Sequence, residues 1–164
     1  MVSSTDRIVK RIFLRAPQER VWRAISESRQ FGAWFGMQFD GEFAPGQPIS
    51  GVLVPTKVDP EVAKTQEKYS GMKFGFIVDR IEPMRRFSFR WHPFSIDPNY
   101  DYSKEPTTLV EFMLEPKDGG TQLTIVESGF DAIPIERRAD AFEANDEGWE
   151  AQAKMVEKYL AMPA

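Results

Sequence analysis

The sequence contains no cysteine and a single histidine, His92, among its 164 residues. The lack of cysteine excludes disulfides, thiolate nucleophiles and zinc sites with sulfur ligands. With one histidine, a serine-type catalytic triad has only one candidate base, and a metal site would have to be built from carboxylates. The sequence therefore predicts no cofactor and no metal site, and no catalytic residue is assigned.

Basic residues and long apolar runs are also scarce. There are 21 Lys and Arg against 25 Asp and Glu, which gives a net charge of −4, and the basic doublets at 85–86 and 137–138 lie beside acids. A nucleic-acid partner is therefore not expected. No stretch is apolar enough for a membrane span, and residues 1–11 contain no apolar segment of signal-peptide length. We expect a cytoplasmic protein without membrane insertion.

Aromatic residues, by contrast, are plentiful. They make up 13% of the chain, including 13 Phe and 4 Trp, a content that suits either a large core or an apolar cavity. A chain of this length buries roughly 70% of the surface that its unfolded form exposes, so it can build one full core. Since no internal repeat or linker indicates a second unit, we expect a single domain over residues 1–164.

The predicted order of elements is a strand, two short helices, a series of strands and one long helix. A strand over residues 7–15 precedes a helix that begins at Pro17, and Ser28 is predicted to cap a second helix that ends at Gly36. Residues 38–54 read as a hairpin. The remaining strands are expected over residues 74–81, 87–92, 108–115 and 121–128. Short turns and alternating patterns indicate an antiparallel sheet with one apolar face.

The last element is a predicted helix from Pro134 of up to roughly 28 residues, or about 42 Å. Side chains spaced three and four residues apart would cover one stripe of it, among them Phe142, Asn145, Trp149 and Gln152. Gly148 lies inside this helix, where glycine costs on the order of 1 kcal/mol relative to alanine. We expect Gly148 either to allow a close backbone approach or to mark a bend.

Two connections are longer than hairpin loops. In residues 55–72, Asp59 is expected to cap a short helix that could serve as a lid. The second, residues 93–106, carries Phe94, Tyr100 and Tyr102 and is a candidate gate. A merely solvated loop is the alternative for each.

Glu127 is the most unusual residue of the pattern. A Gly-Gly turn leads into a strand whose alternate residues share a face, so Glu127 falls on the apolar side with Leu123 and Ile125. An ionised carboxylate is costly to bury unless it is paired or hydrogen-bonded. Two interpretations stay open: Glu127 meets a partner or water in a cavity, or a bulge near the strand end turns it toward the rim.

The order of elements resembles the helix-grip fold of the START-like (SRPBCC) superfamily. This is an α+β fold in which a curved antiparallel sheet wraps around a long C-terminal helix, with two short helices after the first strand. Four separated motifs are similar to its activator-of-heat-shock-ATPase homologue branch: residues 16–22 (APQERVW), 31–35 (FGAWF), 119–130 (GGTQLTIVESGF) and 148–152 (GWEAQ). The resemblance covers nearly the whole chain.

The resemblance implies an internal apolar cavity, between sheet and helix, that binds a hydrophobic or amphipathic small molecule of lipid or polyketide type. The residues that would line it by position are Trp34, Phe76, Trp91, Phe112, Glu127, Phe142, Asn145 and Trp149. Glu127, Asn145 and Gln152 would orient polar groups of the ligand. Ordinary core packing is the alternative for each aromatic residue.

Two other functions stay open beside the favoured binding role. Some superfamily members are cyclases, and a cyclase or hydrolase would use Glu127 as an acid or base. His92 is a weaker candidate, because the strand alternation points it away from the apolar face and predicts a surface histidine. The branch name suggests a partner protein that stimulates a chaperone ATPase. A homodimer through a sheet edge or the long helix also stays open.

Overall fold

The structure, a computed structural model, describes residues 6–95, 97 and 99–163. Residues 1–5, which belong to the segment 1–11 used for the expectation about targeting, lie outside the described residues. The elements in chain order are β1 Arg7–Leu14, α1 Gln18–Ser26, α2 Ser28–Phe35, β2 Met37–Phe39, β3 Pro48–Leu53, α3 Pro60–Gln66, β4 Lys73–Glu82, β5 Arg86–Trp91, β6 Thr108–Lys117, β7 Gly120–Ser128 and α4 Ile135–Ala161. This order confirms the sequence-based prediction.

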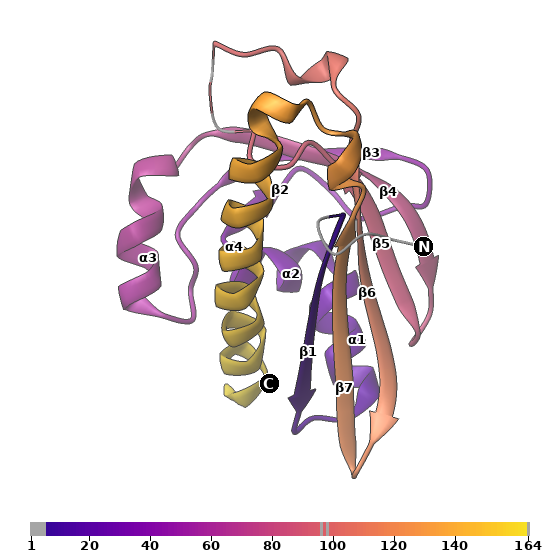
Figure 1. Ribbon diagram of the computed structural model, residues 1–164. Coiled ribbons are helices and arrows are strands. Elements are labelled where there is room, and N and C mark those ends of the chain that lie inside the picture. The colour runs from indigo at the N-terminus through magenta and orange to yellow at the C-terminus, as the bar shows by residue number, and fades with distance from the viewer. Residues whose placement is uncertain (1–5, 96, 98, 164) are drawn as a thin grey trace.

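The strands form one seven-stranded sheet in the order β1-β7-β6-β5-β4-β3-β2. Every neighbouring pair is antiparallel, and the predicted hairpin is the β2–β3 pair. Figure 1 shows the sheet bending around α4, with α1 and α2 beside the same helix and α3 on the side of α4 away from β1. The α+β helix-grip architecture is therefore confirmed.

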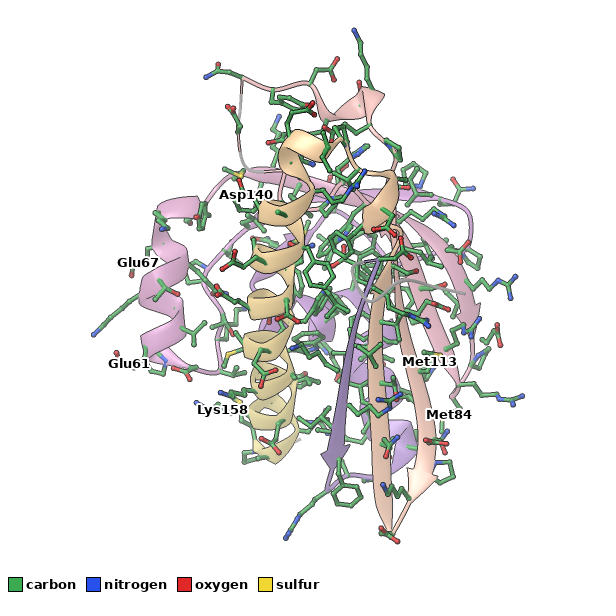
Figure 2. All side chains as sticks on the ribbon, in the orientation of Figure 1. Glu61, Glu67, Met84, Met113, Asp140 and Lys158 are labelled. Atoms are coloured by element: carbon green, nitrogen blue, oxygen red, sulfur yellow. The ribbon has the colours of Figure 1, made fainter. Side chains whose placement is uncertain are left out.

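The core lies between the sheet and the helices and is dominated by aromatic rings. On β5, Phe87, Phe89 and Trp91 are buried and Arg90 is exposed, as the two-residue period of a strand predicts. Ser88 departs from this pattern, because it is buried as well and donates to Asp79 at 2.9 Å. The ring of Phe89 stacks on Phe76 of β4 with centroids 4.0 Å apart. Figure 2 shows side chains filling the space between sheet and α4. Each fully buried ring contributes about 1.5–3 kcal/mol to stability through the area it removes from water.

The end of α2 follows the prediction, but its start does not. Gly36 adopts φ 95° and its N–H donates to the carbonyl of Gly32 at 2.9 Å, which ends the helix. The predicted cap at Ser28 is wrong, because Ser28 is the first helical residue and Glu27 precedes it. The Ser28 hydroxyl donates instead to the carbonyl of Gly41 at 2.7 Å, so it fastens the helix to the chain after β2.

The long helix α4 runs for 27 residues and continues through Gly148. Of the two expectations for Gly148, the close backbone approach is wrong, since a Cβ placed there would meet no atom within 4 Å, and the bend stays a prediction. Among the described residues, no helix has the length and apolar character needed to cross a bilayer.

The short helix α3 begins with the predicted cap. Asp59 accepts hydrogen bonds from the backbone N–H groups of Glu61, at 2.9 Å, and Val62, at 3.2 Å. Lys158 in the last turns of α4 reaches toward this end of α3 and forms an ion pair with Asp59 (Figure 2). The cap is confirmed, whereas a lid movement of this segment stays a prediction.

Candidate functional site

Glu127 lies in the core with 0% of its surface exposed, and four side chains donate hydrogen bonds to its carboxylate. Oε2 accepts from Trp91 Nε1 at 2.7 Å and from Thr108 Oγ1 at 2.5 Å. Oε1 accepts from Trp149 Nε1 at 2.8 Å, while Asn145 Nδ2 lies 2.9 Å from Oε1 and 3.1 Å from Oε2. We call these five residues the Glu127 cluster. Of the two interpretations of Glu127, the bulge is wrong and the partnered carboxylate is the one observed.

Strand register and helix periodicity bring these residues together. In the sheet, Val110 pairs with Glu127 and Trp91 pairs with Thr108, so Thr108 lies two residues from the partner of Glu127 on the same face of β6. The β1–β7 pairing continues through Glu127 without a shift. Asn145 and Trp149 are four residues apart on α4 and therefore lie on one helix face, above the strands.

The donors of the Glu127 cluster fill the acceptor capacity of the carboxylate. Indole and amide N–H groups can only donate, and an ionised carboxylate offers about four acceptor positions, so the pattern fits an ionised Glu127. Among the described residues, no Lys, Arg or His forms an ion pair with Glu127. Its charge is therefore compensated by neutral dipoles alone. Within the same residues, no group of three or more acids or histidines is arranged to hold a metal ion.

A small hollow borders the Glu127 cluster. It has a volume of about 100 Å³ and is lined by Phe35, Trp91, Asn145, Gly148, Trp149 and Gln152. Gly148 is exposed and has no side chain, so the hollow is open to the surface at this position. We call this feature the Gly148 hollow.

The two polar atoms of the Gln152 amide differ in their hydrogen bonding. Its Nε2 donates to the carbonyl of Phe35 at 3.0 Å. Its Oε1 is buried and has no hydrogen-bond partner among the described residues. Buried acceptors are normally paired, so this atom is an exception.

The other predicted lining residues lie in the packed core instead. Trp34 is fully buried and donates to the carbonyl of Ala24 at 2.9 Å. Phe76 stacks on Phe89, Phe112 packs against Trp149 with centroids 5.7 Å apart, and Phe142 packs against Phe130 at 5.2 Å. None of these four residues lines the Gly148 hollow. Rings thus occupy space in which the resemblance implies an apolar cavity.

Thr108 and Phe35 were not among the predicted site residues. Thr108 opens a strand, and only the register between β5, β6 and β7 places it beside Glu127. Phe35 ends the 31–35 motif, which was a signal that it lies near the other aromatic residues. Gln152, which the sequence predicts to orient a ligand, lines the hollow.

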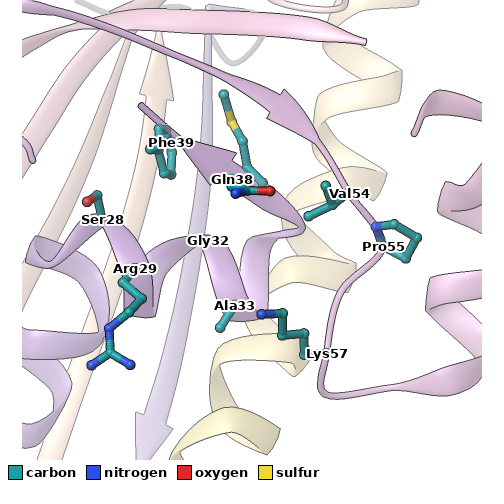
Figure 3. A pocket seen from close by; sticks show the side chains of 10 residues that line it. Ser28, Arg29, Gly32, Ala33, Gln38, Phe39, Val54, Pro55 and Lys57 are labelled. Carbon is teal, nitrogen blue, oxygen red and sulfur yellow. The ribbon is translucent and has the colours of Figure 1, made fainter. Parts of the chain in front are cut away.

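A larger hollow lies on another part of the surface. It has a volume of about 470 Å³ and is lined by Ser28, Arg29, Gly32, Ala33, Met37, Gln38, Phe39, Val54, Pro55 and Lys57. Figure 3 shows its residues coming from α2, β2 and the segment after β3. Since it contains no predicted site residue and does not border Glu127, size alone does not make it the candidate site.

A second polar cluster fastens the 93–106 connection to the start of α4. Arg137 donates to Glu105, with the shortest contact 2.7 Å between Nη2 and Oε1, and to the carbonyls of Pro93 at 3.0 Å and Phe94 at 3.2 Å. Its guanidinium also lies 4.7 Å from the ring centroid of Tyr102. Hydrogen bonds from Arg137 lower the pKa of Glu105 below its ordinary value. We call Arg137, Glu105 and their contacts the Arg137 cluster; a gating role for this segment stays a prediction.

His92 follows β5 and borders the Arg137 cluster. It is half-buried, and its Nδ1 is buried without a hydrogen-bond partner in the described part of the chain, so the prediction of an ordinary surface histidine is wrong. Burial lowers the pKa of His92, and the charge of Arg137 lowers it further, whereas Glu105 and Asp101 act in the opposite direction. The neutral imidazole is therefore favoured in the folded protein.

Comparisons with known proteins place the chain in a family and a fold. The family model of the Activator of Hsp90 ATPase homolog 1-like protein matches residues 15–161. A search of curated proteins finds no match.

Several solved structures share the fold. A protein from Arthrobacter aurescens has a TM-score of 0.72 at 18% identity, with 98% of this chain and 88% of that chain covered. MLL2253 from Mesorhizobium loti has a TM-score of 0.68 at 24% identity, with 94% and 96% covered. DynU16, a protein in the dynemicin biosynthetic locus, has a TM-score of 0.66 at 22% identity; the match covers 96% of this chain but only 48% of DynU16. At these identities the likeness shows the fold alone.

Proposed function

The chain belongs to the Activator of Hsp90 ATPase homolog 1-like family, and from this premise we propose that it binds a hydrophobic or amphipathic small molecule at the Gly148 hollow. The SRPBCC fold of this family typically binds hydrophobic ligands. The observation that carries the proposal is the position of Gly148, which leaves a hollow open beside the residues that hold the buried Glu127 carboxylate.

Neither backbone conformation nor packing explains a glycine at position 148. It is not among the glycines with positive φ, and a Cβ there would meet no atom within 4 Å. Glycine inside a helix nevertheless costs about 1 kcal/mol relative to alanine. A side chain at this position would extend into or over the hollow, so access to the hollow is a reason for keeping glycine.

The lining of the hollow suits the aromatic or aliphatic end of a ligand. The rings of Phe35, Trp91 and Trp149 lie within 6.2 Å of one another, centroid to centroid. An apolar cavity of roughly 150 Å³ accepts benzene, so a hollow of about 100 Å³ with an open side takes about one ring. Asn145 and Gln152 supply the few polar groups that orient a ligand in such sites. The rest of a longer ligand would remain outside the opening.

The proposal is tested by filling the hollow. Gly148→Leu places a side chain in open space, and leucine is a better helix former than glycine, so the variant should fold. Ala151→Leu, at an exposed position of the same helix that does not line the hollow, is the matched control. We expect native mass spectrometry and dye displacement, with a panel of lipids and polyketides, to detect binding by the wild type and Ala151→Leu. Gly148→Leu should weaken it at least about tenfold.

Two results would remove this function. One is a folded wild type that binds no member of the panel. The other is a folded Gly148→Leu variant with unchanged affinity, which would place any binding elsewhere.

The two alternatives have weaker support. An acid–base role requires Glu127 to exchange one of its four donors for substrate, because these donors already fill its acceptor positions. The chaperone-partner role is suggested by the family description alone. A cytoplasmic location and a homodimer stay predictions, which cell fractionation and size-exclusion chromatography would check.

A further inference from the structure

We propose that a second hollow, formed by α1, the start of α2 and the end of α4, binds the phosphate group of a small organic phosphate monoester. Three arginines, Arg20, Arg23 and Arg29, line this hollow, which has a volume of about 240 Å³. We call it the arginine hollow. It shares no lining residue with the Gly148 hollow, so the inference goes beyond the proposed function and does not depend on it.

Three helices bring the lining of the arginine hollow together. Arg20 and Arg23 are three residues apart on α1 and therefore lie on one face of that helix. Arg29 is the second residue of α2, the next helix in the chain. Tyr159 of α4 contacts both helices, because its ring centroid lies 5.1 Å from the Arg20 guanidinium and its hydroxyl donates to Gln30 Oε1 at 3.2 Å. The hollow is thus built by helices that are fastened to one another.

The charged side chains that line the arginine hollow are all cationic. The described residues of its lining include no Asp or Glu. Within the part of the chain that the structure describes, Arg20 and Arg29 form no ion pair. Arg23 is paired with Glu19 at 2.8 Å, but Glu19 is 71% exposed and does not line the hollow. Since cations that share a hollow repel one another, an anion that bridges them is stabilised.

The number and shape of these donors indicate the class of anion. A guanidinium presents paired N–H groups in one plane, and this geometry matches the oxygens of a phosphate or a carboxylate. Two of the three guanidiniums have no acid partner, so a group with close to two negative charges balances them, whereas a carboxylate carries only one. A phosphate monoester, whose second pKa is about 6, carries this charge above neutral pH.

The arginine hollow also has an apolar wall. Met162, which is 44% exposed, and Pro163 line it together with the ring of Tyr159. Inorganic phosphate would leave these groups in water, while the organic part of an ester would cover them, and removing apolar surface from water is favourable. The lining therefore favours an organic phosphate over free phosphate.

The experiment compares three probes, namely phenyl phosphate, phenyl sulfate and inorganic phosphate. Phenyl sulfate has the same ring and nearly the same shape as phenyl phosphate but a single charge, and inorganic phosphate lacks the ring. Dissociation constants for the full chain are measured by NMR titration at about pH 7.5 and low salt. Arg29→Gln removes an exposed arginine of the hollow, so the variant should fold. Arg90→Gln, at an exposed position of β5 outside the hollow, removes the same charge and is the matched control.

We expect phenyl phosphate to bind the wild type and Arg90→Gln alike, and to bind Arg29→Gln about fivefold more weakly, because one charge-assisted contact at a partly exposed site is lost. Phenyl sulfate should bind the wild type about fivefold more weakly than phenyl phosphate, and inorganic phosphate about threefold more weakly. Glu19→Gln should change the affinity in the opposite direction and tighten phenyl phosphate about twofold, since it frees Arg23 from its exposed pair.

Several results would overturn the inference. A wild type that does not bind phenyl phosphate is one, and it is also the result expected if the chain's own terminal carboxylate occupied the arginines. Equal losses of affinity in Arg29→Gln and Arg90→Gln would mean that overall charge, and not the hollow, attracts the phosphate. Phenyl sulfate or inorganic phosphate binding as tightly as phenyl phosphate would exclude a doubly charged organic ligand. These results leave the proposed function untouched, because that function is tested by Gly148→Leu at the other hollow.

Discussion

Two buried carboxylates in this protein are stabilised in opposite ways. Glu127 is fully buried and accepts hydrogen bonds from four neutral side chains. Glu105, 9% exposed, accepts from the guanidinium of Arg137 and from the hydroxyl of Tyr100 at 2.5 Å. In the Arg137 cluster a cation faces the acid, whereas the Glu127 cluster contains no cationic side chain.

This difference indicates different roles. A buried ion pair with further hydrogen bonds links two segments, here the 93–106 connection and the first turns of α4. A carboxylate without a cation is more costly, because desolvation takes several kcal/mol and each hydrogen bond to a charged group returns about 1.5–3 kcal/mol. The Arg137 cluster therefore fastens one segment of the chain to another, whereas the Glu127 cluster, which borders the Gly148 hollow, is the candidate functional site.

The largest expected contrast comes from making each acid an amide. In Glu127→Gln, an amide N–H group must face at least one of the four donors, so we expect a loss of about 3–4 kcal/mol in the free energy of unfolding. In Glu105→Gln, the amide oxygen still accepts from Arg137, which is partly exposed and keeps two carbonyl partners. We expect a loss of about 2 kcal/mol there. Urea denaturation at pH 7 measures both.

Glu143→Gln, at an exposed position of α4, is the control for this pair and should change stability by less than about 0.5 kcal/mol. If Glu127→Gln proved as mild as Glu105→Gln, the Glu127 carboxylate would not depend on its four donors, and the contrast between the two clusters would be lost.

The sequence predicted much of this cluster through periodicity. The two-residue period put Glu127 and Trp91 on the apolar face, and the helical spacing put Asn145 and Trp149 on one stripe. Thr108 could not be found in this way. Its place beside Glu127 depends on the pairing of β5 with β6 across a long connection, and a register of that kind is set by the whole sheet.

The size of the interior space was also beyond sequence reasoning. The same aromatic content fits a hollow or a filled core, and the outcome depends on how rings such as Phe76 and Phe89 stack. Gly148 shows a similar limit, because a helical glycine fits close packing as well as an opening. Only the surrounding structure decides between the two, because no atom lies within 4 Å of a Cβ placed at Gly148.

A smaller contrast separates a charged acceptor from a neutral one. Trp149 donates to the Glu127 carboxylate at 2.8 Å, and Trp34 donates to the carbonyl of Ala24 at 2.9 Å. Phenylalanine at either position removes one N–H group and part of a buried ring. Because hydrogen bonds to charged groups are worth more, we expect Trp149→Phe to cost about 1 kcal/mol more than Trp34→Phe in chemical denaturation. An equal loss of stability in the two variants would mean that the hydrogen bond to the Glu127 carboxylate is no stronger than the one to a peptide carbonyl.

The smallest expected effect is a change of stability with pH, caused by His92 beside the Arg137 cluster. The folded-state pKa of His92 lies below its ordinary value of 6.5 mainly because the ring is buried; the charge of Glu105 opposes this shift and that of Arg137 adds to it. The unfolded chain therefore binds a proton at a higher pH than the folded protein does. The contribution of neutral His92 to stability is complete above about pH 6.5 and is lost as the pH falls toward the lower folded-state pKa.

We expect His92→Gln to remove this decline, so that its melting temperature changes less than that of the wild type between pH 7 and pH 5.5. Carboxylates such as Glu105, whose pKa is lowered by Arg137, titrate below this pH range. The change in stability within the range is therefore assigned to His92. Binding of panel ligands at the Gly148 hollow should be the same at both pH values, since none of the lining residues is a histidine. Parallel melting behaviour of the two proteins would show that His92 does not cause the decline. A ligand affinity that follows the titration of His92 would show that the two clusters are coupled rather than separate.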